Sequence, residues 1–120
     1  MKNRFEDLKV WQLSHQYVLD IYKILKKFPL SEKFGLTDQL KRSSSSVPTN
    51  IVEGNERKTG KEYIQFLYMS KGSLSESKYQ LILARDLGYI TKEECLTLLN
   101  CADEIGKMVN GLIKYLRSKI

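Results

Sequence analysis

The stretch LTDQLKRSSSSVPTNIVEGN, residues 36–55, decides how the rest of the chain is interpreted. Its apolar side chains recur on one face of a 3.6-residue period, which predicts a helix: Leu36, Leu40, Val47 and Ile51. Four consecutive serines and Pro48 oppose this prediction, because serine competes for backbone hydrogen bonds and an interior proline costs a helix about 3 kcal/mol. Nothing local compensates, so we expect tertiary packing to hold the segment as a helix that is kinked near Pro48.

Close packing against this segment is the second expectation. Pro48 has no amide hydrogen for the carbonyl of Ser44, so we expect a nearby hydroxyl to donate to that carbonyl. The small side chains of residues 43–46 would also let another helix approach closely. The stretch is therefore predicted to form the tightly packed centre of a helical protein.

A first helix is predicted to begin at Leu8 behind the cap residue Asp7 and to end before Pro29. Its apolar residues form two adjacent stripes, one made of Leu8, Trp11, His15, Val18, Tyr22 and Leu25 and the other of Val10, Tyr17, Ile21, Ile24 and Phe28. We expect His15 to pack, hydrogen-bonded, on the apolar side. So wide an apolar face predicts contacts with more than one neighbouring helix.

Two more helices follow the quoted stretch. The third is predicted over residues 60–87, where Gly88 ends it. Gly72 in its interior costs about 1 kcal/mol against alanine, which indicates a neighbour packed closely against it. Residues 91–94, TKEE, form a capping box that starts the fourth helix. No strand-like alternation is found, so the chain is predicted to be a single all-α domain, residues 1–120, folded as an antiparallel up-down four-helix bundle.

Composition narrows the class of protein. The 120 residues are 42% hydrophobic and 28% charged, and no apolar run approaches the ~20 residues of a membrane helix. The N-terminus carries charge where a signal peptide is apolar, which predicts a cytoplasmic protein without membrane contact. Cys95 and Cys101 face different directions on one predicted helix, so we expect neither a disulfide nor a metal site with the single histidine, and no cofactor.

The formal net charge of +6 favours an acidic partner, of which nucleic acid is the usual one. A basic cluster follows the quoted stretch and consists of Arg57, Lys58 and Lys61, which Lys41 and Arg42 could join in space. The segment GNERKTGK is not a phosphate loop, because five residues separate its glycines, Glu62 replaces the magnesium-binding hydroxyl, and a helix precedes it. Two interpretations stay open: an ordinary solvated loop, or a patch that contacts phosphates.

Aromatic residues at the start of the third helix point in several directions: Tyr63, Phe66 and Tyr68. Core burial explains some of them. Any that remain exposed would mark a protein interface or a base-stacking surface, and we favour the interface.

Three segments resemble one bacterial family: FEDLKVWQ (5–12), EKFGLTDQLKRSSSSVPTNIVEGNER (32–57) and KEYIQFLYMSKGSLSESKYQLILARDLGYI (61–90). It is the four-helix-bundle family that includes proteins encoded within intervening sequences of 23S ribosomal RNA genes. By the match, the signature positions are Pro48, Asn50, Glu53, Gly54 and Arg57. We interpret Asn50 and Glu53 as polar partners at a helix junction or between subunits, with a simple surface cap as the alternative.

The resemblance implies an up-down bundle that assembles into a ring, typically a homopentamer. The family also looks related to the accessory variability protein of diversity-generating retroelements, a basic pentameric barrel that binds nucleic acid and a reverse transcriptase. No catalytic role is implied. Ser43, Ser44 and Ser45 stand where small apolar residues are common, and Asn55 where a bulkier residue is frequent. These changes make one face more polar, which weakens the expectation of a ring for this member.

Three hypotheses on function follow. The first is a non-enzymatic oligomer that binds RNA or DNA through Lys41, Arg42, Arg57, Lys58 and Lys61. The second is a scaffold for another protein, motivated by the extra apolar stripe of the first helix. The third, an enzyme, has the least support, because the sequence offers no paired nucleophile and base, no metal set and no cofactor loop.

Overall fold

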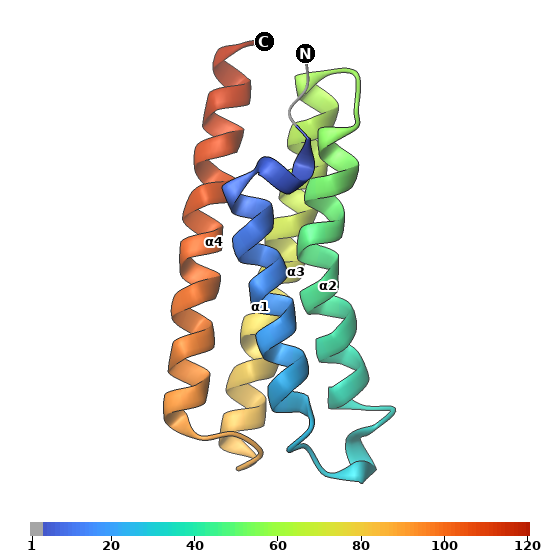
Figure 1. The fold of residues 1–120 in the computed structure, drawn as a ribbon, viewed down its shortest axis with the longest axis vertical. Helices are drawn as coiled ribbons and strands as arrows, with labels where there is room; N and C mark the ends of the chain where they lie inside the picture. The colour runs from blue at the N-terminus through green and yellow to red at the C-terminus, as the bar shows by residue number, and fades with distance from the viewer. Residues whose placement is uncertain (1–3) are drawn as a thin grey trace.

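A computed structural model describes residues 4–120, most of which lie in four long α-helices. In chain order the elements are the 3-10 helix η1 (Phe5–Asp7), α1 (Lys9–Leu25), the 3-10 helix η2 (Leu30–Glu32), α2 (Leu36–Asn55), α3 (Gly60–Asp86) and α4 (Lys92–Ser118). Successive helices run in opposite directions, and α1 and α3 each pack against both α2 and α4 (Figure 1). The described residues contain no strand. The predicted all-α, antiparallel four-helix bundle is confirmed.

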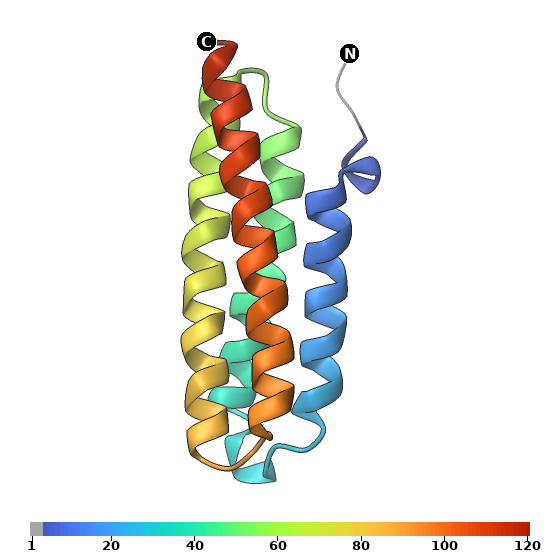
Figure 2. The same ribbon diagram turned by 90° about the vertical axis from the view of Figure 1, so that its left-hand side faces the viewer.

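The bundle is elongated, with extents of 46 × 24 × 21 Å. Helices α3 and α4 each have 27 residues, whereas α1 has 17. The connection between α2 and α3 lies at the same end of the bundle as the C-terminal turn of α4, and the connection between α3 and α4 lies at the opposite end (Figures 1 and 2). This topology decides which charged segments meet.

Most helix ends lie where local sequence signals predict them. At α4 the Thr91 hydroxyl accepts a hydrogen bond from the amide of Glu94 at 3.0 Å, and the Glu94 carboxylate accepts one from the amide of Thr91 at 2.9 Å, so the capping box is confirmed. Gly88 has a φ of 81°, in the left-handed region, and follows α3 as predicted. The prediction that Asp7 caps the first helix is wrong. Asp7 lies within η1, and α1 begins only after Leu8, whose side chain makes no cap.

Helix α2 is continuous through Pro48 and its four serines. Three serine or threonine hydroxyls in it donate to a carbonyl one turn back: Ser44 to Leu40 at 2.6 Å, Ser45 to Lys41 at 2.7 Å and Thr49 to Ser45 at 2.8 Å. Such bonds satisfy the hydroxyls within the helix and favour bending of the helix. The kink near Pro48 stays a prediction.

The α2–α3 contact is the most extensive in the bundle, as the small side chains of α2 predict. Hydroxyls cross it at three levels: Ser43 donates to Gln80 at 2.6 Å, Ser73 donates to Ser46 at 2.9 Å, and Ser70 donates to the carbonyl of Val47 at 2.9 Å. The expected hydroxyl beside the proline is therefore present and comes from α3. Its acceptor is the carbonyl of Val47 and not that of Ser44 as predicted.

The core holds the fully buried Tyr17 among aliphatic side chains. The largest fully buried residues are Tyr17, Ile21, Leu40, Ile51, Leu67, Leu81 and Ile105. The Tyr17 hydroxyl lies 2.7 Å from that of Ser77, which itself donates to the carbonyl of Leu74 at 2.7 Å. Because Ser77 has a single hydrogen, Tyr17 is the donor in this pair. The bond links α1 to α3 through the centre of the bundle.

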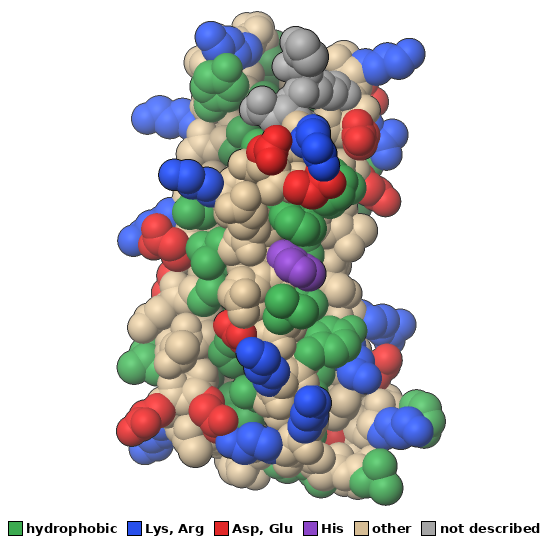
Figure 3. All heavy atoms as spheres, viewed as in Figure 1, with side chains coloured by type: hydrophobic (Ala, Val, Ile, Leu, Met, Phe, Trp, Pro, Cys, Tyr) green, Lys and Arg blue, Asp and Glu red, His purple; other side chains and the backbone are tan. Residues whose placement is uncertain are grey.

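The two predicted stripes of α1 are buried to different extents, and the one that contains His15 enters the core only at Leu25. Val10, Tyr17 and Ile21 are buried, whereas His15 and Tyr22 are exposed. The prediction that His15 packs on the apolar side is wrong: its ring stacks on Trp11 at the surface, with centroids 5.0 Å apart and planes 7° apart. Figure 3 shows this outer face, with His15 between hydrophobic side chains above and below it. The stripe that contains His15 is therefore covered only in part, with Leu8 and Trp11 packed against the edge of the core.

Two helix glycines have opposite surroundings. Gly54 is buried at the α2–α3 contact, where a Cβ would lie 2.8 Å from Cδ1 of Tyr63 and 3.0 Å from Cβ of Phe66. The close neighbour predicted for Gly72 is absent, because that residue is exposed and a Cβ there would meet nothing within 4 Å. Close approach therefore requires a glycine at 54 and not at 72.

We expect Gly54→Ala to lower the free energy of unfolding by about 1–3 kcal/mol, because the ring of Tyr63 must move. Gly72→Ala should raise the same quantity by up to about 1 kcal/mol, because alanine favours the helix and meets no obstacle. Chemical denaturation of both variants measures this. A stabilised Gly54→Ala protein would contradict the close approach of Tyr63 to α2.

Candidate nucleic-acid interface

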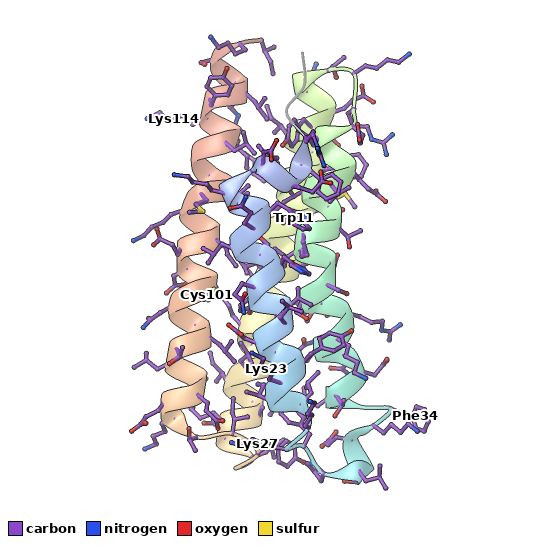
Figure 4. All side chains as sticks on the ribbon, in the orientation of Figure 1. Trp11, Lys23, Lys27, Phe34, Cys101 and Lys114 are labelled. Carbon is purple, nitrogen blue, oxygen red and sulfur yellow. The ribbon has the colours of Figure 1, made fainter. Side chains whose placement is uncertain are left out.

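Basic side chains from two distant parts of the sequence meet at one end of the bundle. Arg57 and Lys58 lie in the connection after α2, and Lys61 lies in the first turn of α3. The antiparallel topology adds cations from the last turns of α4, where Lys114 projects away from the bundle (Figure 4). We name this group the basic end, and its members are Arg57, Lys58, Lys61, Lys114, Arg117 and Lys119.

Aromatic rings hold several of these cations. The Arg57 guanidinium lies 4.5 Å from the ring centroid of Phe66, and the Lys119 ammonium lies 5.4 Å from that of Tyr115. Arg117 donates to the hydroxyl of Tyr68. Within residues 4–120, no member of the basic end belongs to an ion pair. The positive charge at this end is therefore available to an anionic ligand.

Carboxylates dilute the basic end without pairing with it. The three on the α2–α3 connection and its flanks are Glu53, Glu56 and Glu62, all at least partly exposed. Glu62 is hydrogen-bonded at the start of α3. Its carboxylate accepts a hydrogen bond from the hydroxyl of Thr59 at 3.0 Å, and its backbone amide donates one to the same hydroxyl at 3.1 Å. The positive charge is thus densest on the side that α4 supplies.

The other two predicted phosphate contacts lie elsewhere. Arg42 pairs with Asp38 at 3.2 Å on α2, and the Lys41 ammonium lies 5.6 Å from the ring centroid of Tyr22 on α1. About 13 helical residues separate Arg42 from the end of α2, which corresponds to roughly 20 Å. The structure therefore does not bring Lys41 and Arg42 to the basic end, because α2 is one continuous helix between them.

The signature positions gather where α2 meets α3. Pro48 and Gly54 are buried, and the Asn50 amide donates to the carbonyl of Ser46 at 2.9 Å within α2. Asn50 also donates to the Ser46 hydroxyl, which receives the bond from α3 described above. The bonds that Asn50 itself makes stay within α2, so its predicted role at a helix junction or between subunits stays a prediction. Glu53 is exposed and enters no ion pair among residues 4–120.

A cavity of about 280 Å³ opens in the basic end between η1, the α2–α3 connection and α4. Arg57, Lys58, Tyr63 and Tyr115 are among the residues that line it. The Tyr63 hydroxyl is buried and has no hydrogen-bond partner in the part of the chain that the structure describes. Burial raises the pKa of Tyr63 to about 12, so the phenol is neutral at physiological pH.

The two cysteines of the chain are shielded from solvent to different extents, Cys95 being buried and Cys101 half-buried. Burial raises the pKa of both the Cys95 and the Cys101 thiol, which disfavours the reactive thiolate. No three histidine, cysteine, aspartate or glutamate side chains of residues 4–120 gather as a metal-binding group. Over the same residues, no helix is long and apolar enough to span a membrane. What the surface offers is charge and exposed aromatic rings.

Fold and surface together define a small helical bundle with one basic end and an exposed apolar face on α1. The chain belongs to the 23S rRNA-intervening sequence protein family, whose model matches residues 6–111. A crystal structure of a protein of unknown function from the S23 ribosomal protein family of Bacteroides thetaiotaomicron superposes with a TM-score of 0.81 at 27% identity, covering 88% of this chain and 98% of that one. No curated protein sequence matches the chain.

The cations of α4 are the part of the basic end that sequence reasoning missed. Taken locally, Lys114, Arg117 and Lys119 are typical of an ordinary helix end. The available signal was topology, since in an antiparallel bundle the end of the fourth helix must lie beside the start of the third.

Two buried tyrosines should respond oppositely to loss of the hydroxyl. Tyr63→Phe is expected to raise the free energy of unfolding by up to about 1 kcal/mol, because it removes an unsatisfied buried group. Tyr17→Phe is expected to lower it by about 1 kcal/mol, because a satisfied hydrogen bond to Ser77 is lost. Urea denaturation of the two variants measures both. Destabilisation by Tyr63→Phe would show that its hydroxyl has a partner.

Proposed function

We propose that the protein is a non-enzymatic, oligomeric helical bundle that binds RNA or DNA through its basic end. The observation that carries the proposal is the meeting of unpaired cations from the α2–α3 connection and from α4. A local excess of positive charge attracts phosphate backbones and releases their counterions. Lys41 and Arg42, about 20 Å along α2, would contact a longer nucleic acid at a second position.

The family supports RNA as the first partner to test. The family name refers to 23S rRNA, and the similar Bacteroides protein is assigned to the S23 ribosomal protein family. The raised pKa values of both thiols support the non-enzymatic part of the proposal, because they leave the only cysteines unreactive. The same two free cysteines support a reducing, cytoplasmic location.

The outer face of α1 supports self-association. It carries Trp11, Val18 and Tyr22 in one row, with the ring of Phe5 packed edge-on against Trp11 at 5.1 Å. Burial of such side chains between copies stabilises an oligomer by roughly 25 cal/mol for each Å² of apolar surface removed from water. The resemblance implies five copies, and a ring would multiply the positive charge of one chain.

A scaffold for a different protein is the second candidate. The same α1 face favours it, because that face would fit an apolar helix of a partner as well as a copy of the chain. In this case the basic end would serve solubility alone. Association that survives nuclease treatment with a fixed ratio of a second protein, together with a monomeric chain in isolation, would favour the scaffold.

Nucleic-acid binding predicts a steep dependence on salt. Lys58→Ala/Lys61→Ala should reduce the slope of log affinity against log salt by about 1.4–1.8, or 0.7–0.9 for each lost phosphate contact. Titration of a labelled RNA between low and moderate salt measures the slope. The matched control, Lys26→Ala/Lys92→Ala, removes the same charge from exposed positions at the opposite end and should leave the slope unchanged. No binding by the wild type at low salt would overturn the proposal.

Self-association predicts a solution mass several times that of the 14.0 kDa chain. Light scattering measures it. Tyr22→Glu should shift the mass toward one chain, because it places a charge in the α1 face, whereas Tyr79→Glu on the outer side of α3 should leave it unchanged. A wild type of single-chain mass would remove the oligomeric part of the proposal and leave the binding part to be judged by titration.

A further inference from the structure

The outer side of the α3–α4 pair is hollowed along most of its length. An upper hollow of about 650 Å³ is lined by Lys61, Ile64, Gln65, Tyr68, Met69, Arg117 and Ile120. A lower one of about 410 Å³ has Lys71, Lys78, Asp103 and Lys107 among its lining residues. The two helices lie side by side in Figure 2. Both hollows are lined by residues of α3 and of the α4 end of the chain. We name the pair of hollows the α3–α4 groove.

The two hollows meet at one aromatic residue. Tyr68 lines the upper hollow, and the ammonium of Lys71, which lines the lower one, lies 5.5 Å from the centroid of its ring. The guanidinium of Arg117 approaches the same ring from α4 at 5.6 Å. Lys61 to Lys78 spans about 17 helical residues, so the α3–α4 groove is roughly 25 Å long.

The lining of the α3–α4 groove is complementary to a phosphate backbone. The upper hollow contains Lys61 and Arg117 and no acidic side chain among its described lining residues. In the lower hollow Asp103 is the carboxylate, and it is already bound to the Lys78 ammonium at 2.6 Å. Lys71 and Lys107 therefore keep their charge uncompensated. Cations repeat along both walls of the groove.

Tyr68 is positioned to accept a base. Its side chain is 44% exposed, although it lies between two cations that could have covered it. A stacked base binds an aromatic ring more strongly than a single exposed cation does, although stacking here would also displace the hydrogen bond from Arg117 to the Tyr68 hydroxyl. The long Lys71 and Arg117 side chains can therefore leave the ring for phosphates when a base stacks on it.

Small residues lie beside the α3–α4 groove on both helices, although Gly72 itself lines neither hollow. Gly72 lies one helical turn beyond Tyr68 along α3, where it disfavours the helix and serves no contact within the chain. Ala102 and Gly106 occupy the facing wall of the lower hollow. Because the axes of packed helices are only about 8–10 Å apart, the α3–α4 groove is a narrow surface furrow over their contact line, which a single strand can follow more closely than a duplex.

We propose that the α3–α4 groove binds an unpaired strand of nucleic acid, with phosphates on Lys61, Lys71, Lys107 and Arg117 and a base stacked on Tyr68. This inference rests on the proposed function and narrows it to single-stranded ligands. The strand enters at the basic end, because Lys61 and Arg117 belong to both surfaces. A base exposed in a loop or bulge of RNA would present the same chemistry.

The test compares three probes on the wild type and on Tyr68→Ala: a single-stranded oligonucleotide, a duplex of equal length, and inorganic polyphosphate. The wild type should prefer the single strand to the duplex. Tyr68→Ala should weaken single-strand binding roughly 5- to 100-fold and leave polyphosphate binding unchanged, because polyphosphate has charge but no bases. Tyr79→Ala is the matched control, since Tyr79 is a 61% exposed tyrosine of the same helix that lines neither hollow.

A spectroscopic readout separates stacking from a structural effect. Tyr68→Trp in a Trp11→Phe background carries a single tryptophan, whose fluorescence the single strand should quench and polyphosphate should not. Thermal unfolding of each variant checks its fold, and Tyr68→Phe should retain the affinity if the ring is what binds. Equal binding of single strand and duplex, or full affinity in Tyr68→Ala, would overturn the proposal that the α3–α4 groove binds a single strand. Either result would leave the proposed function intact. Absence of binding to all three probes would end both.

Discussion

The hydroxyl-mediated contact between α2 and α3 is the constraint on which the rest of the bundle depends. A helix with four serines and an interior proline has little reason to form alone. It forms because α3 supplies Ser70 and Gln80 as hydrogen-bond partners, and because Gly54 lets the ring of Tyr63 approach. Once α2 and α3 are joined, α1 and α4 complete the core by ordinary apolar packing. The features that we propose for binding are consequences of that arrangement.

This arrangement produces two surfaces, for which we propose different roles. The short α1 buries one stripe and leaves Trp11 and Tyr22 outward, which gives the molecule an apolar face. The longer α3 and α4 carry their cations to the basic end and along the α3–α4 groove. An assembly through α1 would therefore leave the groove accessible, so self-association and binding of a strand are compatible in one molecule.

How far the sequence predicts this molecule depends on whether a signal is local. The capping box at Thr91 and the glycine stop at Gly88 depend on a few adjacent residues, and both were predicted correctly. Which stripe of α1 enters the core depends on neighbouring helices, so His15 was misplaced. Gly72 was misinterpreted for the same reason, since a helix glycine signals either close approach or open space. The cations of α4 lie near Lys61 only because the topology brings the two helix ends together. Lys41 lies far from Lys61 because α2 is one continuous helix, and that continuity cannot be predicted from the residue types alone.

Directional bonds across the α2–α3 contact have a mechanical consequence. Apolar side chains would tolerate a slide of one helix along the other, whereas a slide here would break the bonds of Ser43, Ser46 and Val47 together. Helices α2 and α3 therefore pack in a single register and form a rigid pair. In an assembly through the α1 face, each copy would therefore hold its α3–α4 groove in a fixed orientation relative to that face.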